Sequence, residues 1–204
     1  MSAPSRGLNE RLCEPSGAVL RTFIFEAFYS SLAFYLKRSA HQAKRSSNGA
    51  PRALKIVIAG GGTGGHLFPG LAIAQEFMTR NERNTVLFIS TGNPLERSVL
   101  NETGFRLETI TAEGIKGRGL WNQAKSAIKI PKGVIEAIRI LKDYQPDLII
   151  GLGSYSAGAV VVGAKLRGTK IALHEQNILP GITTRILARF ADRIYVSFDD
   201  TGKR

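Results

Sequence analysis

Cysteine is nearly absent from this chain of 204 residues, which contains only Cys13. A single cysteine excludes an internal disulfide and a cysteine-based metal site, and this scarcity fits a reducing, cytoplasmic setting. Acidic residues are also few: sixteen Asp and Glu oppose twenty-eight Lys and Arg, and the formal net charge is +12. This imbalance predicts an anionic partner, and nucleic acid, an acidic membrane leaflet and phosphorylated ligands all remain open.

The sequence also lacks a long apolar run free of charge, so it predicts no membrane-spanning helix. The most apolar segment, 18–36, contains Arg21 and Glu26, and each would cost about 2.5–3.5 kcal/mol inside hydrocarbon. Its apolar residues recur at helical spacing, so we expect an amphipathic helix that lies in a membrane interface. This helix belongs to an N-terminal extension, residues 1–53, for which a poorly ordered segment is the alternative. The two charges also argue against a secretory signal.

Residues 54–204 alternate short β-branched runs with helical stretches. This pattern predicts one α/β domain, a doubly wound, Rossmann-like parallel sheet covered by helices on both faces. We expect strands at 55–59, 86–90, 106–110, 147–152, 170–173 and 193–197, and helices at 69–80, 95–103, 120–144, 157–167 and 182–190. Open sheets of this kind bind ligands at the carboxyl ends of their strands, so functional residues are expected in the loops there.

The first such loop is rich in glycine, reading Gly-Gly-Gly-Thr-Gly-Gly over 60–65. A dinucleotide-binding fingerprint would need an acidic residue at the end of the second strand, and none is present there. A Walker motif would need Lys followed by Ser or Thr, which is also missing. What remains is a cradle of backbone N–H groups for phosphate or pyrophosphate, with Thr63, Gly64 and Gly65 as its binding residues. Tight packing of strand on helix is the alternative reason for the glycines.

His66 follows this loop at the expected start of a helix. The positive end of the helix dipole favours a neutral imidazole, which can accept a proton. The chain has only three histidines, and His174 is expected at the same edge of the sheet. His66 is therefore a candidate general base, and direct ligand binding is the alternative role.

Two further loops at the same edge carry polar residues. The loop at 151–158 offers Gly153, Ser154 and Tyr155 as ligand contacts, although a tyrosine half-buried at the sheet edge is equally consistent. In the loop at 174–181, four polar residues in a row would be costly to bury without partners, which a ligand rich in hydroxyl groups would supply. Glu175 is suited to orient a hydroxyl group or take a proton, while Asn177 either bridges hydroxyl groups or caps the next helix.

Together these motifs resemble the N-terminal domain of the MurG-like glycosyltransferases of family 28, which have the GT-B fold. The matching segments are 61–66 with Pro69-Gly70, the loop at 151–158, and His174-Glu175-Gln176-Asn177 with Pro180-Gly181. The resemblance covers residues 54–204. It implies an inverting hexosyltransferase of peptidoglycan synthesis, which moves N-acetylglucosamine from UDP-N-acetylglucosamine to an undecaprenyl-pyrophosphoryl-muramyl pentapeptide. It implies no cofactor and no metal ion, and a peripheral location on the cytoplasmic face of the inner membrane.

The resemblance also implies roles for individual residues. His66 and Glu175 become the catalytic candidates for removing the proton of the acceptor hydroxyl group. The residues of the two glycine loops meet the acceptor pyrophosphate or approach the donor, and the amide of Asn177 contacts the donor sugar. The substrate-binding residues are therefore Thr63, Gly64, Gly65, Gly153, Ser154, Tyr155 and Asn177. The chain departs from the family pattern at Ser154, Ala159 and Thr184, where glycine, proline and asparagine are usual.

The sequence ends at Arg204, before any donor-binding half of such an enzyme. We therefore expect a truncated transferase that is inactive alone. The alternative is a non-catalytic, membrane-associated subunit of a split transferase, which binds the lipid pyrophosphate and depends on a second chain for the donor.

A basic surface is expected on the long helix and the segment before it. Seven basic residues lie between positions 116 and 142, where Glu136 is the only acid: Lys116, Arg118, Lys125, Lys129, Lys132, Arg139 and Lys142. Apolar residues that include Trp121 lie among them, so the segment predicts contact with an anionic membrane surface. In the resembling family the corresponding region faces the membrane, while a solvated helix face over ordinary core is the alternative. No nucleic-acid reader motif accompanies the charge, so nucleic acid is not expected as a partner.

Overall fold

A computed structural model describes residues 52–112, 120–198 and 200–201, and it describes the side chains of all these except 120–129. The chain divides into two units, 1–50 and 51–204, and every described residue belongs to the second. The helix predicted at 18–36 and the basic residues Lys116 and Arg118 lie outside the described residues. No helix in the described part is both long and apolar enough to cross a bilayer.

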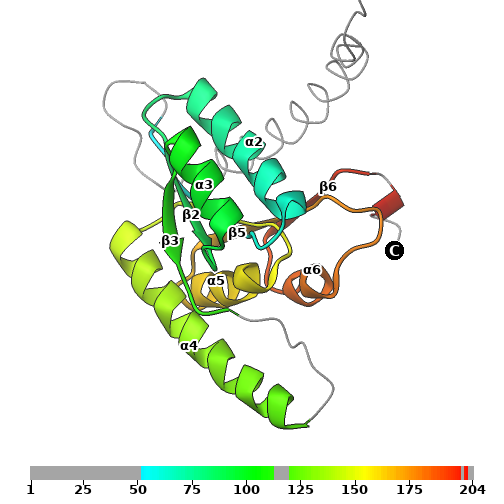
Figure 1. The fold of residues 1–204 in the computed structure, drawn as a ribbon. Coiled ribbons are helices and arrows are strands. Elements are labelled where there is room, and N and C mark those ends of the chain that lie inside the picture. The colour runs from blue at the N-terminus through cyan, green and yellow to red at the C-terminus, as the bar shows by residue number, and fades with distance from the viewer. Residues whose placement is uncertain (1–51, 113–119, 199, 202–204) are drawn as a thin grey trace, which may run out of the picture. The chain divides into compact units, whose positions relative to one another are not determined.

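The described unit is a six-stranded parallel sheet with the strand order β3-β2-β1-β4-β5-β6 (Figure 1). Its strands are β1 (Lys55–Ala59), β2 (Thr85–Ser90), β3 (Arg106–Thr109), β4 (Leu148–Gly151), β5 (Lys170–Glu175) and β6 (Arg193–Val196). Its helices are α2 (Gly64–Arg80), α3 (Pro94–Thr103), α4 (Leu120–Tyr144), α5 (Tyr155–Leu166) and α6 (Ile182–Leu187). The strand order is that of a Rossmann fold, which confirms the predicted doubly wound sheet.

Helices cover both faces of this sheet. One face packs on α4 and α5, where Val57 and Ile149 join Ala137 and Val160 in a single buried cluster. The helices α2 and α3 lie on the other face (Figure 1). Because both faces are covered, the four residues of β1 after Lys55 are all fully buried. This explains why the central strands read as continuous apolar runs instead of alternating patterns.

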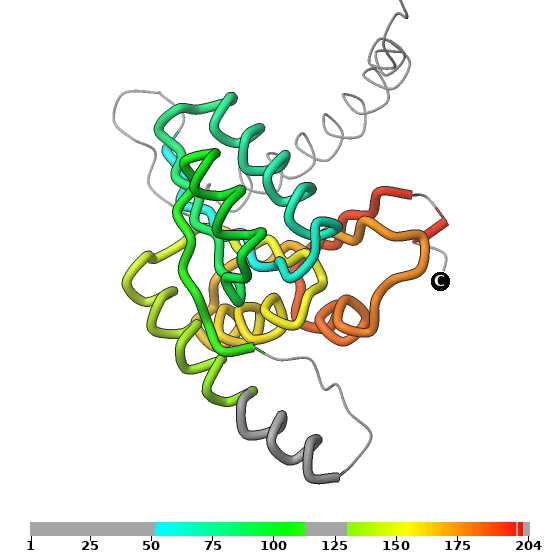
Figure 2. The backbone as a smooth tube through the Cα atoms, viewed as in Figure 1, coloured from blue at the N-terminus to red at the C-terminus, as the bar shows by residue number. Residues whose placement is uncertain are grey.

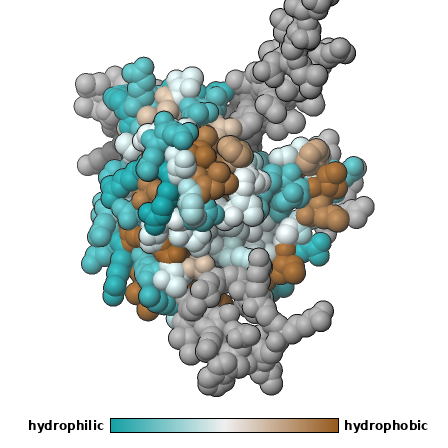
Figure 3. Space-filling view, in the orientation of Figure 1, coloured by the Kyte–Doolittle hydropathy of each residue, from teal (hydrophilic) through white to brown (hydrophobic). Residues whose placement is uncertain are grey.

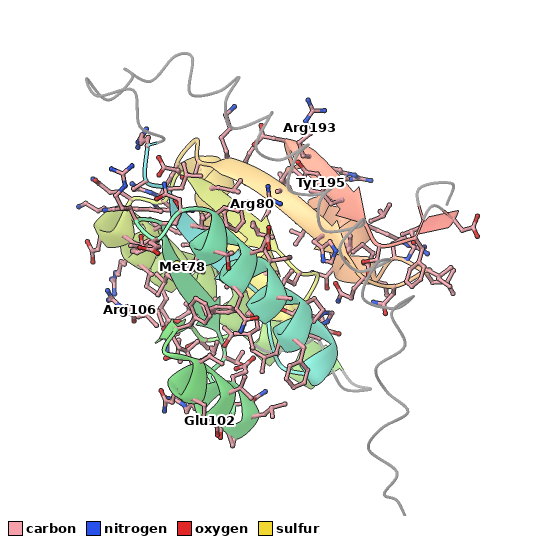
Figure 4. All side chains as sticks on the ribbon, turned by 90° about the horizontal axis from the view of Figure 1, so that it is seen from above. Met78, Arg80, Glu102, Arg106, Arg193 and Tyr195 are labelled. Carbon is pink, nitrogen blue, oxygen red and sulfur yellow. The ribbon has the colours of Figure 1, made fainter. Side chains whose placement is uncertain are left out.

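The edge strands of the sheet are more exposed than the central strands β1 and β4. The edge strands β3 and β6 have four residues each. Figure 4 shows Arg106 on β3, and Arg193 with Tyr195 on β6 at the opposite edge. Short edge strands that carry charge are a usual protection against pairing with another chain.

Three boundaries at the ligand-binding edge differ from the prediction by two residues or more. The helix α2 begins at Gly64 and not at Pro69, because a proline this close to the start removes only the N–H that would bond to the carbonyl of Gly65. The strand β5 continues through His174 and Glu175, since these two residues still pair with Tyr195 and Val196 of β6. The helix α5 begins at Tyr155, two residues before the predicted start.

The end of β3 is tied to α4 by Glu136. Its carboxylate accepts hydrogen bonds from the backbone N–H of Thr111, at 2.5 Å, and from the Thr111 hydroxyl, at 3.2 Å. The backbone N–H is the main reason why the pKa of Glu136 lies below its ordinary value, and Lys132 nearby acts in the same direction.

We expect Glu136→Gln to lower the free energy of unfolding at pH 7, and with it the melting temperature. The loss should be at most about 1 kcal/mol, because solvent screens the carboxylate. A carboxyl group whose pKa is depressed on folding contributes stability above its unfolded pKa, and this is lost as the pH falls through the folded pKa. The difference from wild type, followed by thermal unfolding, should therefore shrink below about pH 4. The exposed Glu82→Gln serves as control. A deficit of constant size from pH 7 to pH 3 would contradict the assignment.

Candidate functional site

The candidate site lies where β1, β4 and β5 end. These three strands are neighbours at the centre of the sheet, with Ala59 opposite Gly151 and Gly151 opposite Leu173. The loops that follow them lead into α2, α5 and α6, and the path of the chain through these turns can be followed in Figure 2. The strand order therefore confirms that the three predicted loops share one edge of the sheet.

The first three glycines of the loop after β1 have internal acceptors for their N–H groups. The N–H of Gly60 donates to the carbonyl of Ile89 at 3.2 Å, and that of Gly61 donates to Oγ of Ser154 at 3.3 Å. The N–H of Gly62 donates to Oε1 of Glu96. Three donors of the glycine run are therefore bound within the protein, and none of them belongs to the residues predicted to bind the phosphate.

The free donors are those at the start of α2. Among the described residues, the N–H groups of Thr63, Gly64 and Gly65 have no acceptor. Thr63 is the N-cap residue, but its side chain makes no capping hydrogen bond, and both Thr63 and Gly65 are exposed. Unpaired N–H groups and the positive end of the helix dipole together form a place for an anion.

Glu96 is a residue of the site that the sequence analysis missed. Its side chain is only 1% exposed, and it accepts hydrogen bonds from the Ser90 hydroxyl at 2.7 Å and the Asn93 N–H at 2.8 Å, besides the one from Gly62. Asn93 in turn accepts from the N–H of Glu96 at 2.9 Å, which completes a capping box at the start of α3. The sequence signal was available, since Asn followed three residues later by Glu is the pattern of such a box.

In the second loop, Ser154 and Gly153 have internal contacts. The hydroxyl of Ser154 caps α5 by accepting from the N–H of Ala157 at 3.3 Å, besides the N–H of Gly61. Gly153 has a φ of 83°, and a Cβ there would lie 2.6 Å from Oγ1 of Thr184. Tyr155, at 54% exposed, is the side chain of this loop that is open to a ligand.

The third loop is organised by Glu175, which is only 2% exposed. Its Oε1 accepts from the backbone N–H of Asn177 at 3.0 Å and from the Asn177 side-chain amide at 2.9 Å, and its Oε2 accepts from the N–H of Gly181 at 3.2 Å. Burial alone would raise the pKa of Glu175, but the nearby hydroxyl of Thr184 and the hydrogen bonds from Asn177 and Gly181 outweigh it and hold the pKa below its ordinary value. Glu175 is therefore an ionised carboxylate with internal partners on both oxygens.

Asn177 lies in the same loop, with an exposed side chain. The N-cap of α6 is Gly181, so the alternative that Asn177 caps this helix is wrong. Its amide nitrogen is bound to Glu175, and its backbone carbonyl accepts from the Thr201 hydroxyl at 2.9 Å. The amide is thus held in place while the residue stays open to solvent.

His66 lies in the first turn of α2 and meets the third loop. Its Nδ1 is hydrogen-bonded to the side-chain amide of Gln176, and the same amide nitrogen donates to the carbonyl of Leu152 at 3.4 Å. Burial lowers the pKa of His66, while the charge of Glu175 opposes this shift. Burial, the main cause of the lowered pKa, therefore favours the neutral imidazole.

Among the described residues, no group of three or more His, Cys, Asp or Glu side chains is placed to hold a metal ion.

The third loop and α6 expose several large apolar side chains, and Figure 3 shows apolar surface on the side where α6 lies. These side chains are Ile178, Leu179, Ile182 and Ile186, each at least 50% exposed.

The comparisons with known proteins agree on one family. The family model of the glycosyltransferase family 28 N-terminal domain matches residues 56–196. A UDP-N-acetylglucosamine--N-acetylmuramyl-(pentapeptide) pyrophosphoryl-undecaprenol N-acetylglucosamine transferase of Syntrophus aciditrophicus is 48% identical over 150 residues, which are 74% of this chain and 42% of the relative. The transferase of the same name from Geobacter sulfurreducens is 47% identical, over 72% of this chain and 41% of the relative. The chain thus spans about two fifths of the length of these relatives.

Solved structures give the same result for the fold. The crystal structure of Acinetobacter baumannii MurG matches with a TM-score of 0.61 and 30% identity, over 74% of this chain and 43% of that one. The UDP-GlcNAc 2-epimerase of Neisseria meningitidis matches with a TM-score of 0.55 over 74% of this chain and 42% of that one, but at only 10% identity, so that it shows the fold alone.

Proposed function

This chain belongs to glycosyltransferase family 28, and on that premise we propose that it forms the acceptor-binding half of an N-acetylglucosaminyltransferase that acts on an undecaprenyl-pyrophosphoryl-linked muramyl pentapeptide. The observation that carries the proposal is the uncapped start of α2, where the free N–H groups of Thr63, Gly64 and Gly65 lie beside His66. A diphosphate is the anion that this arrangement suits, because it needs several donors and a positive dipole end but no enclosed pocket. The transferases named above supply the substrate class.

The reaction is a displacement with inversion at the anomeric carbon of N-acetylglucosamine. The 4-hydroxyl oxygen of the acceptor forms the new bond to this carbon as its O–H bond breaks, and the bond to the UDP oxygen breaks with the electron pair leaving on UDP. The donor, UDP-N-acetylglucosamine, is held mainly by a further domain. We expect Asn177 and Tyr155, which are both exposed, to contact donor and acceptor.

Two residues remain candidates for handling the acceptor proton. Glu175 has protein donors on both carboxylate oxygens, which suits a group that orients the loop around the sugar. His66 has one ring nitrogen, Nε2, without a hydrogen-bond partner among the described residues. This nitrogen can serve the substrate in two ways, as the acceptor of the hydroxyl proton or as a hydrogen-bond donor to the diphosphate.

We further propose that the enzyme works on the cytoplasmic face of the membrane as a peripheral protein. Part of the predicted basic surface lies on the described half of α4, where Lys132, Arg139 and Lys142 are exposed. Two large apolar side chains on the same helix, Ile130 and Ile135, are about half exposed. Basic and apolar side chains mixed on one helix suit an anionic lipid surface, which also brings the domain to a lipid-linked acceptor.

The proposal is tested by deleting one backbone donor. Gly64 is the first residue of α2, and Thr63 before it has extended backbone angles of −141° and 156°. A proline fits this position and lacks only the N–H. Binding of a short-chain polyprenyl-diphosphate-linked acceptor, measured by calorimetry, should weaken roughly tenfold or more in Gly64→Pro, because a hydrogen bond to a charged group is lost.

Gly64→Ala is the matched control, since it keeps the N–H and also displaces the half-exposed ring of Phe68 that both variants would touch. It should bind the acceptor as the wild type does. Fusing the chain to the C-terminal part of the Syntrophus aciditrophicus relative should give transfer from UDP-N-acetylglucosamine. Equal binding by the Pro and Ala variants would refute the diphosphate site. A folded fusion that binds acceptor but transfers nothing would favour the non-catalytic subunit, and saturable binding of NADH without acceptor binding would overturn both.

A further inference from the structure

We propose that Gln176 is a positioning residue that holds the imidazole of His66 as the Nε2–H tautomer. The open edge of the ring then donates a hydrogen bond to an anionic oxygen of the ligand. Only the identity of that ligand, a diphosphate, rests on the proposed function. The tautomer itself follows from the contacts of one amide group with two acceptors.

The amide nitrogen of Gln176 lies between two atoms that can accept a hydrogen bond. One is the carbonyl oxygen of Leu152, at 3.4 Å, and the other is Nδ1 of His66. A primary amide has two N–H groups, so one nitrogen serves both partners. The backbone carbonyl has no protons and only accepts, so it fixes which end of the Gln176 amide faces this side.

The opposite orientation of the Gln176 amide leaves more hydrogen-bonding groups without a suitable partner. It would place Oε1 of Gln176 against the carbonyl oxygen of Leu152, so that two acceptors would meet, and only the bond to His66 would survive. It would also leave both amide N–H groups in the place now occupied by Oε1. That oxygen is buried and has no partner among the described residues. The observed orientation leaves one acceptor unsatisfied, whereas the rotated amide would leave two donors and a repulsive contact.

A fixed amide determines the state of the imidazole. Nδ1 of His66 accepts a hydrogen bond from Gln176, so in the neutral ring the hydrogen is on Nε2. Burial favours this neutral ring, and Glu175 is the charged group whose field acts on it. Nε2 has no hydrogen-bond partner among the described residues, and His66 is partly exposed.

The result is one more donor beside those of α2. His66 is the third residue of this helix, directly after the free N–H groups of Thr63, Gly64 and Gly65. An Nε2–H group extends this set of donors from backbone to side chain. In this tautomer the ring does not accept the hydroxyl proton, because its only unprotonated nitrogen is bound to Gln176. A general-base role for His66 would require the amide of Gln176 to rotate.

The tautomer is measured directly by ¹H–¹⁵N NMR on the 204-residue chain, without any turnover. The chain has three histidines, and the resonances of His66 are identified as those lost in His66→Asn. At a pH where the ring is neutral, Nδ1 should have the shift of an unprotonated nitrogen and Nε2 that of a protonated one. The reverse assignment in the wild-type chain would overturn the proposal.

Two substitutions test the part played by Gln176. Gln176→Met keeps the length of the side chain but has no donor. In this variant the ratio of the Nε2–H tautomer to the Nδ1–H tautomer should fall roughly tenfold, because a hydrogen bond is lost. In Gln176→Glu the carboxylate only accepts, so the proton should move to Nδ1. An unchanged ratio in Gln176→Met would refute the positioning role even if Gln176→Glu fails to fold. Gln75→Met, an exposed glutamine on the helix of His66, is the control and should leave the spectrum unchanged.

Inorganic diphosphate tests the donor role. Its addition should shift the Nε2–H resonance of the wild-type chain, and this shift should be lost in Gln176→Glu. Saturation with diphosphate that leaves the Nε2–H resonance in place would exclude His66 as a donor to this anion. Because neither measurement depends on sugar transfer, a fusion that fails to transfer leaves the tautomer result intact, and a wrong tautomer leaves the proposed transferase intact.

Discussion

Replacing Glu175 by glutamine is expected to destabilise the chain by about 2–4 kcal/mol at pH 7, because a buried carboxylate that accepts three hydrogen bonds is lost. The carboxylate accepts from two N–H groups of Asn177 and one of Gly181, and the side chain is 2% exposed. A glutamine would turn one of its two acceptor atoms into an NH₂ group that faces these donors. Thermal or urea unfolding of the variant should report the loss directly.

The effect of Glu175→Gln should depend on pH. Hydrogen bonds hold the folded pKa of Glu175 below its ordinary value, so the carboxylate contributes stability that is present above the unfolded pKa, about 4.3. This contribution is lost as the pH falls through the folded pKa. The stability gap between the variant and wild type should therefore be constant from pH 7 to about pH 5 and narrow at lower pH.

The same variant separates an organising role from a catalytic one. Glu102→Gln, on the exposed face of α3, removes a carboxylate that accepts a hydrogen bond from the Ser98 hydroxyl at 3.2 Å, and it should change stability little. If Glu175→Gln is as stable as wild type while the fusion enzyme loses transfer, the organising role is wrong and Glu175 acts on the substrate. If stability falls and the third loop loses its order, lost transfer follows from the loop and not from a missing base.

The architecture was predictable because a covered parallel sheet leaves a strong pattern. Residues of β1 are buried on both faces, so their apolar run stands out between Lys55 and the glycines. The end of β5 was missed for the opposite reason. His174 and Glu175 are polar and looked like a loop, but they still pair with β6, and Glu175 obtains its partners from the turn that follows.

The location of the site was predictable from the sequence, but the hydrogen-bond partners of its residues were not. A glycine run, a histidine and a polar loop at strand ends indicate a shared edge, and the strand order brings them together. The partners of these residues come from distant parts of the chain: Glu96 reaches Gly62 across 34 positions, and Gln176 reaches His66 across 110. Neither distance leaves a periodic signal in the sequence. The sequence predicts the hydroxyl of Ser154 as a ligand contact, although a serine before a helix is equally typical of a cap.

Gly61→Ala should be the most damaging single change in the glycine loop, with a loss of about 3 kcal/mol or more, because the new methyl group would overlap the carboxylate of Glu96. The Cβ would also lie 2.8 Å from Cδ of Glu96 and 3.1 Å from Cβ of Ser90. Glu96 is not free to withdraw, since Ser90, Asn93 and Gly62 all donate to it in a buried position. Displacing it breaks the capping box of α3 and the anchor of the loop together.

The matched control is Gly65→Ala in the same loop. A Cβ at Gly65 would meet only Oγ1 of Thr63, at 3.8 Å, which is an ordinary contact, and the residue is helical. This change should be neutral or stabilise by up to about 1 kcal/mol, because alanine loses less entropy than glycine on entering a helix. The free energies of urea unfolding of Gly61→Ala and Gly65→Ala separate the cost of steric overlap at Gly61 from the effect of replacing a glycine by alanine.

A double-mutant cycle decides whether Glu96 is the cause of the loss. Shortening the side chain in Glu96→Asp withdraws the carboxylate from Gly61, so the variant with both changes should be more stable than the sum of the two single losses predicts, by at least about 1 kcal/mol. Such coupling would mean that position 61 is a glycine because the buried carboxylate of Glu96 needs the space. The ligand would then use only the free N–H groups of Thr63, Gly64 and Gly65. Additive losses would instead place the constraint in the backbone of Gly61, and Glu96 would then be a helix cap without influence on the anion site.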